Sequence, residues 1–462
     1  MLIRDQAGRT ARLLLYSGIL WLFVALAAGL GAVLIAAGAL YIPLPYGPAG
    51  ADLLQPVFLH ALVFGWLSMA GTGVGLLAVQ RAHGLPLASE TWGQFSVWLW
   101  NGANAAAVVL LLMGWLDGPP LAEAVWPVKA VWAAALLLLL LNVARTLSRA
   151  RQPLYASAWY LLAAMTWMAP LYLLGGGVFA PGWPADDISG LLYSIYTQGV
   201  VWLWAVPLSL AGALYVAPDL AGQSLYSRAL ASWGLWGLAL YAAAGVERLT
   251  GAAMPGWLPP VAAGLSVLAL VPALANATNI VQTIRPRWAA VAATPPGRSL
   301  VWGTVLLVVA AVQTALQPLS VVHDVVQRTQ LAVSGPLIAM LGGSTYLLFA
   351  GIYHLLPMLR RPADRPDHPL YRPGVARWHL GLSGLGTVLF VAGLWFGGAM
   401  QVTERLSFGP GADLAGVLWP ALMLQAAALG IFLVGQVFLV YTVAKAASAP
   451  QPVKLPVIIT NP

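Results

Sequence analysis

Long apolar runs recur along almost the whole chain, and they constrain its fold more than any other feature of the sequence. From Leu13 to about Val443 they are interrupted only by short segments. A helix needs about 20 apolar residues to cross about 30 Å of hydrocarbon. Since 60% of the 462 residues are hydrophobic and only 8% are charged, a water-soluble fold would expose a very large apolar surface. The sequence therefore predicts an all-α, polytopic membrane protein.

About twelve of these runs are long enough to span a bilayer, so residues 1–462 are expected to form one transmembrane domain. The connecting segments are short and contain Gly and Pro, which favour turns. The spans are expected near residues 13–38, 55–79, 93–116, 121–144, 154–179, 189–217, 229–250, 259–283, 299–322, 328–357, 376–399 and 414–444.

Lys and Arg residues gather on one side of the predicted spans. With the N-terminus inside, 18 of the 22 Lys and Arg residues fall on the inner side, and positively charged loops stay cytoplasmic during insertion. This pattern predicts an even number of spans with both termini in the cytoplasm. The basic residues form no continuous face, so no nucleic-acid partner is expected. The lipid bilayer is the expected partner, in the inner (cytoplasmic) membrane of a bacterium or archaeon.

Four segments carry a family resemblance. They read FLHALVFGW at residues 58–66, GALYVAP at 212–218, LYAAAG at 240–245 and FAGIYHLLP at 349–357. In this order and at this spacing they resemble subunit I of the haem-copper oxidases, most closely the C-family cytochrome c oxidases and the nitric oxide reductases. The resemblance implies a haem-copper oxidase subunit I-like bundle of about twelve helices.

Transfer of the family's ligands, residue by residue, implies that most of them are missing. His60 matches the histidine that binds the low-spin haem b, and Tyr241 matches the tyrosine that the C-family links to a copper ligand. The other ligand positions fall on residues that are not histidine: the copper ligands on Gln198, Glu247 and Arg248, and the two haem ligands of the tenth span on Gly335 and Leu337.

The supply of metal-binding side chains agrees with this reading. The chain has no cysteine, so any metal must use histidine, methionine or oxygen ligands. A dioxygen-reducing copper needs about three imidazoles, and each haem needs a strong axial ligand. The six histidines are spread over loops and span ends, with His60 alone in its layer, and are not expected to converge on one centre: His60, His83, His323, His354, His368 and His379.

Two roles stay open for His60: a neutral imidazole hydrogen-bonded between helices, or the axial ligand of one haem b. Tyr241 is expected to form an interhelical hydrogen bond, and Gln198 to make polar contacts between helices. The pocket that binds the metals in the family is expected to be filled by side chains such as Trp202, Trp204 and Leu337, or to hold lipid or quinone.

The favoured function is a subunit without catalytic metals that supports a respiratory or electron-transfer complex. No catalytic residue and no copper are expected, and at most one haem b. Its expected partners are other membrane or periplasmic redox subunits, and quinone is a further candidate. The alternatives are an active terminal oxidase or nitric oxide reductase, which would be an oxidoreductase, and a membrane transporter.

Overall fold

The computed structural model describes residues 8–44, 47–48, 50–176, 187–242, 255–358, 372–409 and 415–447. They form helices and one pair of two-residue antiparallel strands, β1 (Pro43–Leu44) and β2 (Gly47–Pro48). The α-helices are α1 (Arg9–Ala36), α2 (Ala51–His60), α3 (Ser68–His83), α4 (Glu90–Leu112), α5 (Trp126–Leu147), α6 (Ala156–Pro170), α7 (Asp187–Gly199), α8 (Val206–Ala221), α9 (Arg228–Gly237), α10 (Leu258–Leu268), α11 (Leu270–Ile284), α12 (Trp288–Ala293), α13 (Pro295–Leu316), α14 (Ser320–Val326), α15 (Gln330–Leu337), α16 (Thr345–Met358), α17 (Pro373–Phe408) and α18 (Ala415–Ala447).

Six shorter helical segments continue or connect these helices. Four are π-helical and two are 3₁₀-helical: η1 (Ala61–Leu67), η2 (Leu171–Gly175), η3 (Val200–Ala205) and η7 (Ile338–Ser344) in the first group, η4 (Leu238–Ala242) and η6 (Arg285–Arg287) in the second.

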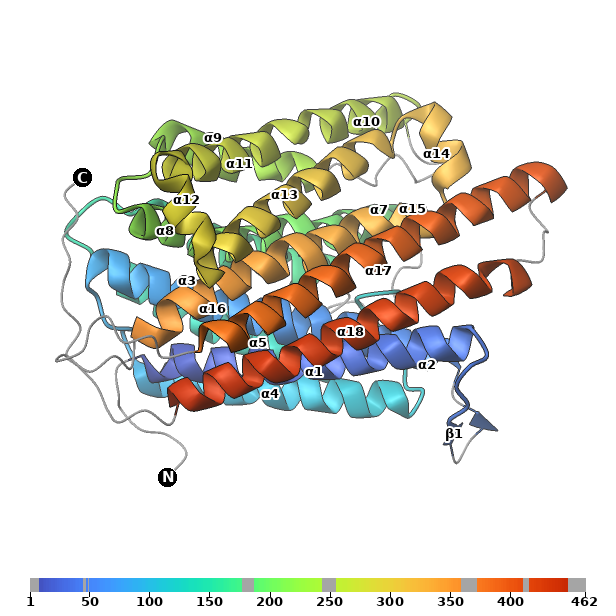
Figure 1. Cartoon of the computed structure of the whole chain (residues 1–462), viewed down its shortest axis with the longest axis horizontal. Coiled ribbons are helices and arrows are strands. Elements are labelled where there is room, and N and C mark those ends of the chain that lie inside the picture. The colour runs from blue at the N-terminus through green and yellow to red at the C-terminus, as the bar shows by residue number, and fades with distance from the viewer. Residues whose placement is uncertain are drawn as a thin grey trace.

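Eleven continuous helical runs in the described residues are long and apolar enough to cross a membrane. They confirm the all-α, polytopic class that the sequence predicts. The seventh expected span, 229–250, is the exception, because only its first part, α9 and η4, is described. The start of α1 and the end of α18 lie at the same end of the bundle (Figure 1).

Three spans form the centre of the bundle. The most apolar window is 100% buried in the run Ala51–His83, 94% buried in Gly190–Ala221 and 72% buried in Gln330–Pro357, whereas no other span exceeds 56%. A helix that is apolar all round and buried inside a bundle contacts protein rather than lipid on every face. These central spans are α2–η1–α3, α7–η3–α8 and α15–η7–α16, and each carries at least one of the matched ligand positions discussed above.

Each central span contains a π-helical segment directly after that position. His60 precedes η1, Leu337 precedes η7, and Gln198 lies two residues before η3. A π-helical turn inserts an extra residue into the helix and rotates the side chains that follow, and such turns are frequent at functional sites. The backbone therefore has a local irregularity at the positions that the resemblance matches to the family's ligands.

Side chains from neighbouring helices satisfy the backbone carbonyls around η1. The carbonyl of Phe64 accepts hydrogen bonds from Trp100 Nε1 (2.9 Å) and Asn104 Nδ2 (3.0 Å), and Ser68 Oγ donates to the carbonyl of Val63 (2.6 Å). In the membrane interior an unsatisfied backbone group is costly, so helix irregularities need such partners. Two tryptophans complete the link between central spans: Trp66 Nε1 donates to Thr345 Oγ1 (2.9 Å) and Trp204 Nε1 donates to Ser68 Oγ (2.7 Å).

Candidate functional site

His60 ends α2 and is almost completely buried, with 4% of its surface exposed. Its ring lies 5.0 Å from the ring of Phe64, centroid to centroid. Its Nε2 atom has no hydrogen-bond partner among the described residues. An unpartnered buried imidazole nitrogen is free to accept a hydrogen bond or to bind a metal. The position of His60 does not distinguish between its two expected roles, a hydrogen-bonded neutral imidazole and the axial ligand of one haem b.

A cluster of aromatic rings continues from Phe64 across four neighbouring spans. Trp132 of α5 lies at its centre, 5.1 Å from Phe64, 5.0 Å from Trp100 and 4.3 Å from Tyr172. Trp204 joins the cluster 6.3 Å from Trp132. Such ring pairs add stability beyond their buried area. Aromatic packing therefore occupies this side of α2.

Tyr241 and Trp202 stack face to face in the centre of the bundle. Their ring centroids are 3.9 Å apart and the ring planes differ by 7°. Both residues are completely buried. The Tyr241 hydroxyl has no hydrogen-bond partner among the described residues, so the interhelical hydrogen bond expected from the sequence is not found there. Ring stacking holds Tyr241 instead.

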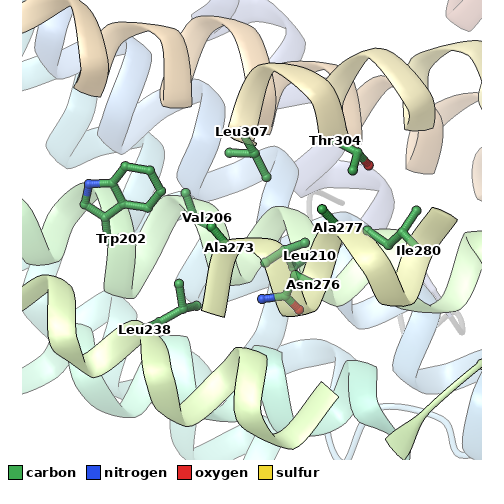
Figure 2. A pocket seen from close by; sticks show the side chains of 10 residues that line it. All are labelled: Trp202, Val206, Leu210, Leu238, Ala273, Asn276, Ala277, Ile280, Thr304 and Leu307. Atoms are coloured by element: carbon green, nitrogen blue, oxygen red, sulfur yellow. The ribbon is translucent and has the colours of Figure 1, made fainter. Parts of the chain in front are cut away.

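The space beside this stack is small. Figure 2 shows the ten side chains around it, with Trp202 at one edge and Leu238, Val206 and Leu307 next to it. The enclosed volume is about 20 Å³, which is enough for about one water molecule. Trp202 and Trp204 are both buried, and the expectation that they fill the pocket of the family's metals stays a prediction.

Gly335 lies against another helix. A β-carbon at this position would lie 3.0 Å from Thr314 Oγ1 and 3.8 Å from the carbonyl of Ala310, both on α13. An imidazole would need still more space than a β-carbon. In this chain, α13 therefore packs closely against residue 335, and Thr314 would have to shift slightly to admit a side chain there.

The other ligand positions are divided between a large cavity and residues outside the described ranges. Leu337 and Gln198 both line the cavity described below. Glu247 and Arg248 lie outside the described residues.

Two further histidines have polar partners. His354 Nε2 lies 2.5 Å from Asp219 Oδ2, and the ring of His379 lies 2.9 Å from the Tyr353 hydroxyl and 3.2 Å from Gln436 Oε1. Within the described ranges, no three His, Cys, Asp or Glu side chains gather into a group that could hold a metal ion. His60, His354 and His379 therefore have separate surroundings.

A cavity of about 700 Å³ lies between α1, α2, α7, α15, α17 and α18. Its lining residues recur at helical spacing, for example 190, 193, 194, 197, 198 and 201 in α7 and η3, so each helix contributes one face. Small-molecule sites usually have volumes of about 300–1,000 Å³. The sequence predicts that a pocket holding lipid or quinone could exist, but it does not predict which faces would form it.

His60 does not line this cavity, although its helix does. Residues 51, 55, 58 and 59 form the wall that α2 contributes. Successive residues in an α-helix are about 100° apart, so His60 points to the opposite face of α2, toward the aromatic cluster. Phe58, with 7% of its surface exposed, is one of the four residues in that wall.

The described walls of the cavity are neutral. Seven polar residues line it among twenty apolar ones: Gln55, Tyr193, Ser194, Thr197, Gln198, Gln330 and Gln425. None of the described lining residues is charged and none is a histidine. Among the described lining residues, Met340 and Tyr193 have side chains of a kind that binds haem iron.

These residues do not fit the complete metal set of the family. Gln198 offers a neutral amide where copper would require imidazole, and Gly335 has no side chain that could bind a haem. The described cavity walls offer no histidine as an axial ligand for a haem. A single haem b at His60 remains a prediction, and it would have to lie on the aromatic side of α2.

Comparison with known proteins gives a family. The model of the family "Cytochrome C and Quinol oxidase polypeptide I" matches residues 9–433. A solved haem-copper terminal oxidase dimer covers 97% of this chain and 86% of its own with a TM-score of 0.74 and 14% sequence identity, which is a likeness of fold.

Two curated relatives are similar over three quarters of this chain. A cytochrome c oxidase subunit 1 homolog from Azorhizobium caulinodans is 25% identical over 362 residues, which are 75% of this chain and 64% of that protein. A cbb3-type cytochrome c oxidase subunit CcoN1 from Stutzerimonas stutzeri is 24% identical over 362 residues, 75% of this chain and 74% of that protein. The chain thus spans less than two thirds of the first of these relatives.

Proposed function

Because this chain belongs to the cytochrome c and quinol oxidase polypeptide I family, we propose that it is a non-catalytic member that supports a respiratory or electron-transfer complex. It is a haem-copper oxidase subunit I-like membrane protein, and its relatives are bacterial oxidase subunits. The proposal places it in a bacterial inner membrane beside subunits that carry redox centres.

The stacked Trp202–Tyr241 pair is the observation that carries this proposal. The two aromatic rings are 3.9 Å apart, and the space beside Trp202 holds about one water molecule. The close approach of α13 to Gly335 supports the same conclusion from the other side. Oxygen or nitric oxide reduction needs two metals held in this region, and the residues described at the positions matched to their ligands are not histidines.

A second candidate is a subunit that holds one haem b through His60. The unpartnered Nε2 atom of this buried imidazole favours it. The orientation of His60 away from the large cavity opposes it. An active oxidase has no such observation in its favour, and a transporter fits the span count alone.

Metal and haem analysis of the purified protein tests the proposal. We expect no copper and at most one haem b per chain, measured by mass spectrometry of metals and by the absorbance of the pyridine haemochrome. If a Soret band is present, His60→Ala should remove it, while the buried His379→Ala should leave it in protein that remains folded. Copper with two haems per chain would contradict the proposal.

A further inference from the structure

The large cavity runs parallel to the helices that line it. Along α7 and η3 its lining extends from Gly190 to Val201, which is about 16 Å of helix at about 1.5 Å per residue. Along α15 and η7 it extends from Gln330 to Met340, which is about 15 Å. The hydrocarbon core of a bilayer is about 30 Å thick, so each of its two leaflets contributes about 15 Å. The cavity therefore has the length of the acyl layer of one leaflet.

The cavity opens at the end of the bundle where α1 ends and α2 begins. Two residues of these helices, Ala36 and Gln55, line it there and are exposed. Its other end is closed, because Val201, Met340 and Leu429 line it and are at most 2% exposed. Since the spans end where the cavity opens, this opening lies at a membrane surface. A ligand therefore enters from the surface and extends toward the middle of the bundle.

Three polar side chains on the walls already form hydrogen bonds within the protein. The Tyr193 hydroxyl donates to the carbonyl of Pro120 (2.9 Å), and Thr197 Oγ1 donates to a carbonyl of its own helix (3.0 Å). Gln425 Nε2 donates to Gln330 Oε1 (2.7 Å). A polar group is costly to bury against hydrocarbon only where it lacks such a partner. These walls therefore do not need a polar ligand and can accept an alkyl chain.

An alkyl chain also fits the cavity better than water or a charged ligand. No described lining residue is charged, so a carboxylate or phosphate deep inside would lack a counter-charge, and burying an unpaired charge is costly. Water in a mainly apolar cavity would find few polar partners. An empty space of about 700 Å³ would leave the lining atoms without contacts on one side.

Charges of both signs stand next to the lining residues of the open end. Asp52 follows Ala51 in the first turn of α2, and Arg328 lies two residues before Gln330. Both charged residues are exposed. A guanidinium group pairs with a phosphate, and a carboxylate pairs with an ammonium group. A headgroup that carries both charges therefore matches this end, whereas a free fatty acid offers only a carboxylate.

We propose that this cavity binds one acyl chain of a zwitterionic phospholipid, such as phosphatidylethanolamine. The chain extends along α7 and α15 toward Val201 and Met340, the headgroup stays at the open end, and the second acyl chain remains in the bilayer. The bound lipid packs α1 and α2 against α17 and α18. This inference goes beyond the proposed function, which concerns only the lost metals.

Lipid analysis of the purified full-length protein is the first test. The protein is delipidated in detergent, incubated with equal amounts of phosphatidylethanolamine and phosphatidylglycerol, washed and analysed by mass spectrometry. We expect about one phosphatidylethanolamine per chain. Leu337→Trp and Leu422→Trp fill the cavity from α15 and α18, and each should lose this lipid. Val434→Trp, at an exposed position of α18 outside the lining, is the matched control and should retain it.

Two further measurements locate the chain and the headgroup. A phosphatidylethanolamine with a diazirine near the end of one acyl chain should, on illumination, label peptides that contain Val201, Met340 or Leu429, and an excess of unlabelled lipid should compete. Asp52→Lys, at an exposed position, should shift the retained lipid from phosphatidylethanolamine toward phosphatidylglycerol. An unchanged ratio of the two lipids would overturn the assignment of a zwitterionic headgroup.

The proposal is overturned if the folded wild type retains no phospholipid, or if the wild type, Leu337→Trp and Leu422→Trp retain it equally. Crosslinks confined to the exposed faces of the helices would also overturn it, as would a free fatty acid, a quinone or haem b that phosphatidylethanolamine cannot displace. The wild-type measurements do not depend on the folding of any variant, and the metal analysis tests the proposed function separately.

Discussion

Glu123 and Lys129 are buried, 7% and 3% exposed, in and after the loop that joins α4 to α5. Lys129 Nζ donates to the carbonyl of Asp117 (3.0 Å), and the amide of Asp117 donates to the carbonyl of Glu123 (2.8 Å). Burial raises the pKa of Glu123 to about 7, although backbone hydrogen bonds and the charge of Lys129 lower it. This carboxyl group therefore changes its protonation near neutral pH.

We expect the stability of the protein to fall as pH rises from about 5 to 8. A carboxyl group whose pKa is higher in the folded state, here about 7 instead of 4.5, stabilises the fold fully below the unfolded pKa and loses this contribution through the folded pKa. The difference corresponds to at most about 3 kcal/mol. The midpoint of thermal unfolding in detergent, measured at a series of pH values, reports the change.

Glu123→Gln should remove most of this pH dependence, because the amide does not titrate. Asp52→Asn, at an exposed position in the first turn of α2, is the matched control and should keep the wild-type slope. A slope in Glu123→Gln equal to that of the wild type would show that another group is responsible.

Sequence reasoning at the residue scale identified His60 but not its surroundings. The apolar residues around it predicted a buried imidazole, and 4% exposure is consistent with that. Its direction depends on which face of α2 meets α7 and α15. That face is fixed by packing across more than 100 residues of sequence, which the periodicity of one short helix cannot show.

At the scale of elements, Val74 of α3 joins the three central spans. A β-carbon on Gly212 of α8 would lie 2.3 Å from Val74 Cγ1, and one on Gly351 of α16 would lie 2.4 Å from the same atom. Both glycines therefore allow the branched side chain of Val74 to lie between their helices. Small residues at helix contacts are typical of membrane bundles.

We expect Gly351→Ala to destabilise the protein by about 1–3 kcal/mol, because the added methyl group overpacks this contact and Val is stiff about χ1. Val74→Ala alone should also destabilise it by leaving a void. The double variant should be more stable than the sum of the two effects predicts, which a double-mutant cycle of thermal unfolding measures. Gly430→Ala, where a β-carbon meets no atom within 4 Å, is the control, and additive effects would contradict this interpretation.

The sequence predicts the spans but not the irregularities within them. Helical runs cross the bundle where apolar runs of sufficient length predict them, because the bilayer sets the length that each needs. The segments η1, η3 and η7 have no Gly, Pro or charge pattern in common at the point where the extra residue is inserted. They are stabilised by partners from other spans, such as Trp100 for η1, so their cause lies outside the local sequence.

At the scale of the whole molecule, the ends of the bundle differ in charge. Most of the described Arg residues lie at the end where α1 begins and α18 ends, for example Arg9, Arg145 and Arg287. The opposite end holds Lys129, Arg328 and Arg405. Because both described ends of the chain lie on the same side of the bundle, the chain must cross it an even number of times. The unequal distribution of positive charge predicts which side is cytoplasmic.

Single-cysteine labelling tests this orientation directly, because the wild-type chain has no cysteine. Ser148→Cys follows α5 at the basic end, and Ser407→Cys lies in the last turn of α17 at the opposite end; both positions are exposed. In spheroplasts with an intact cytoplasmic membrane, a membrane-impermeant maleimide should label Ser407→Cys and leave Ser148→Cys unlabelled. Permeabilisation should make both react, which controls for accessibility. Labelling of Ser148→Cys alone in intact spheroplasts would mean that the basic end faces outward, and labelling of both would mean that the chain does not insert with one orientation.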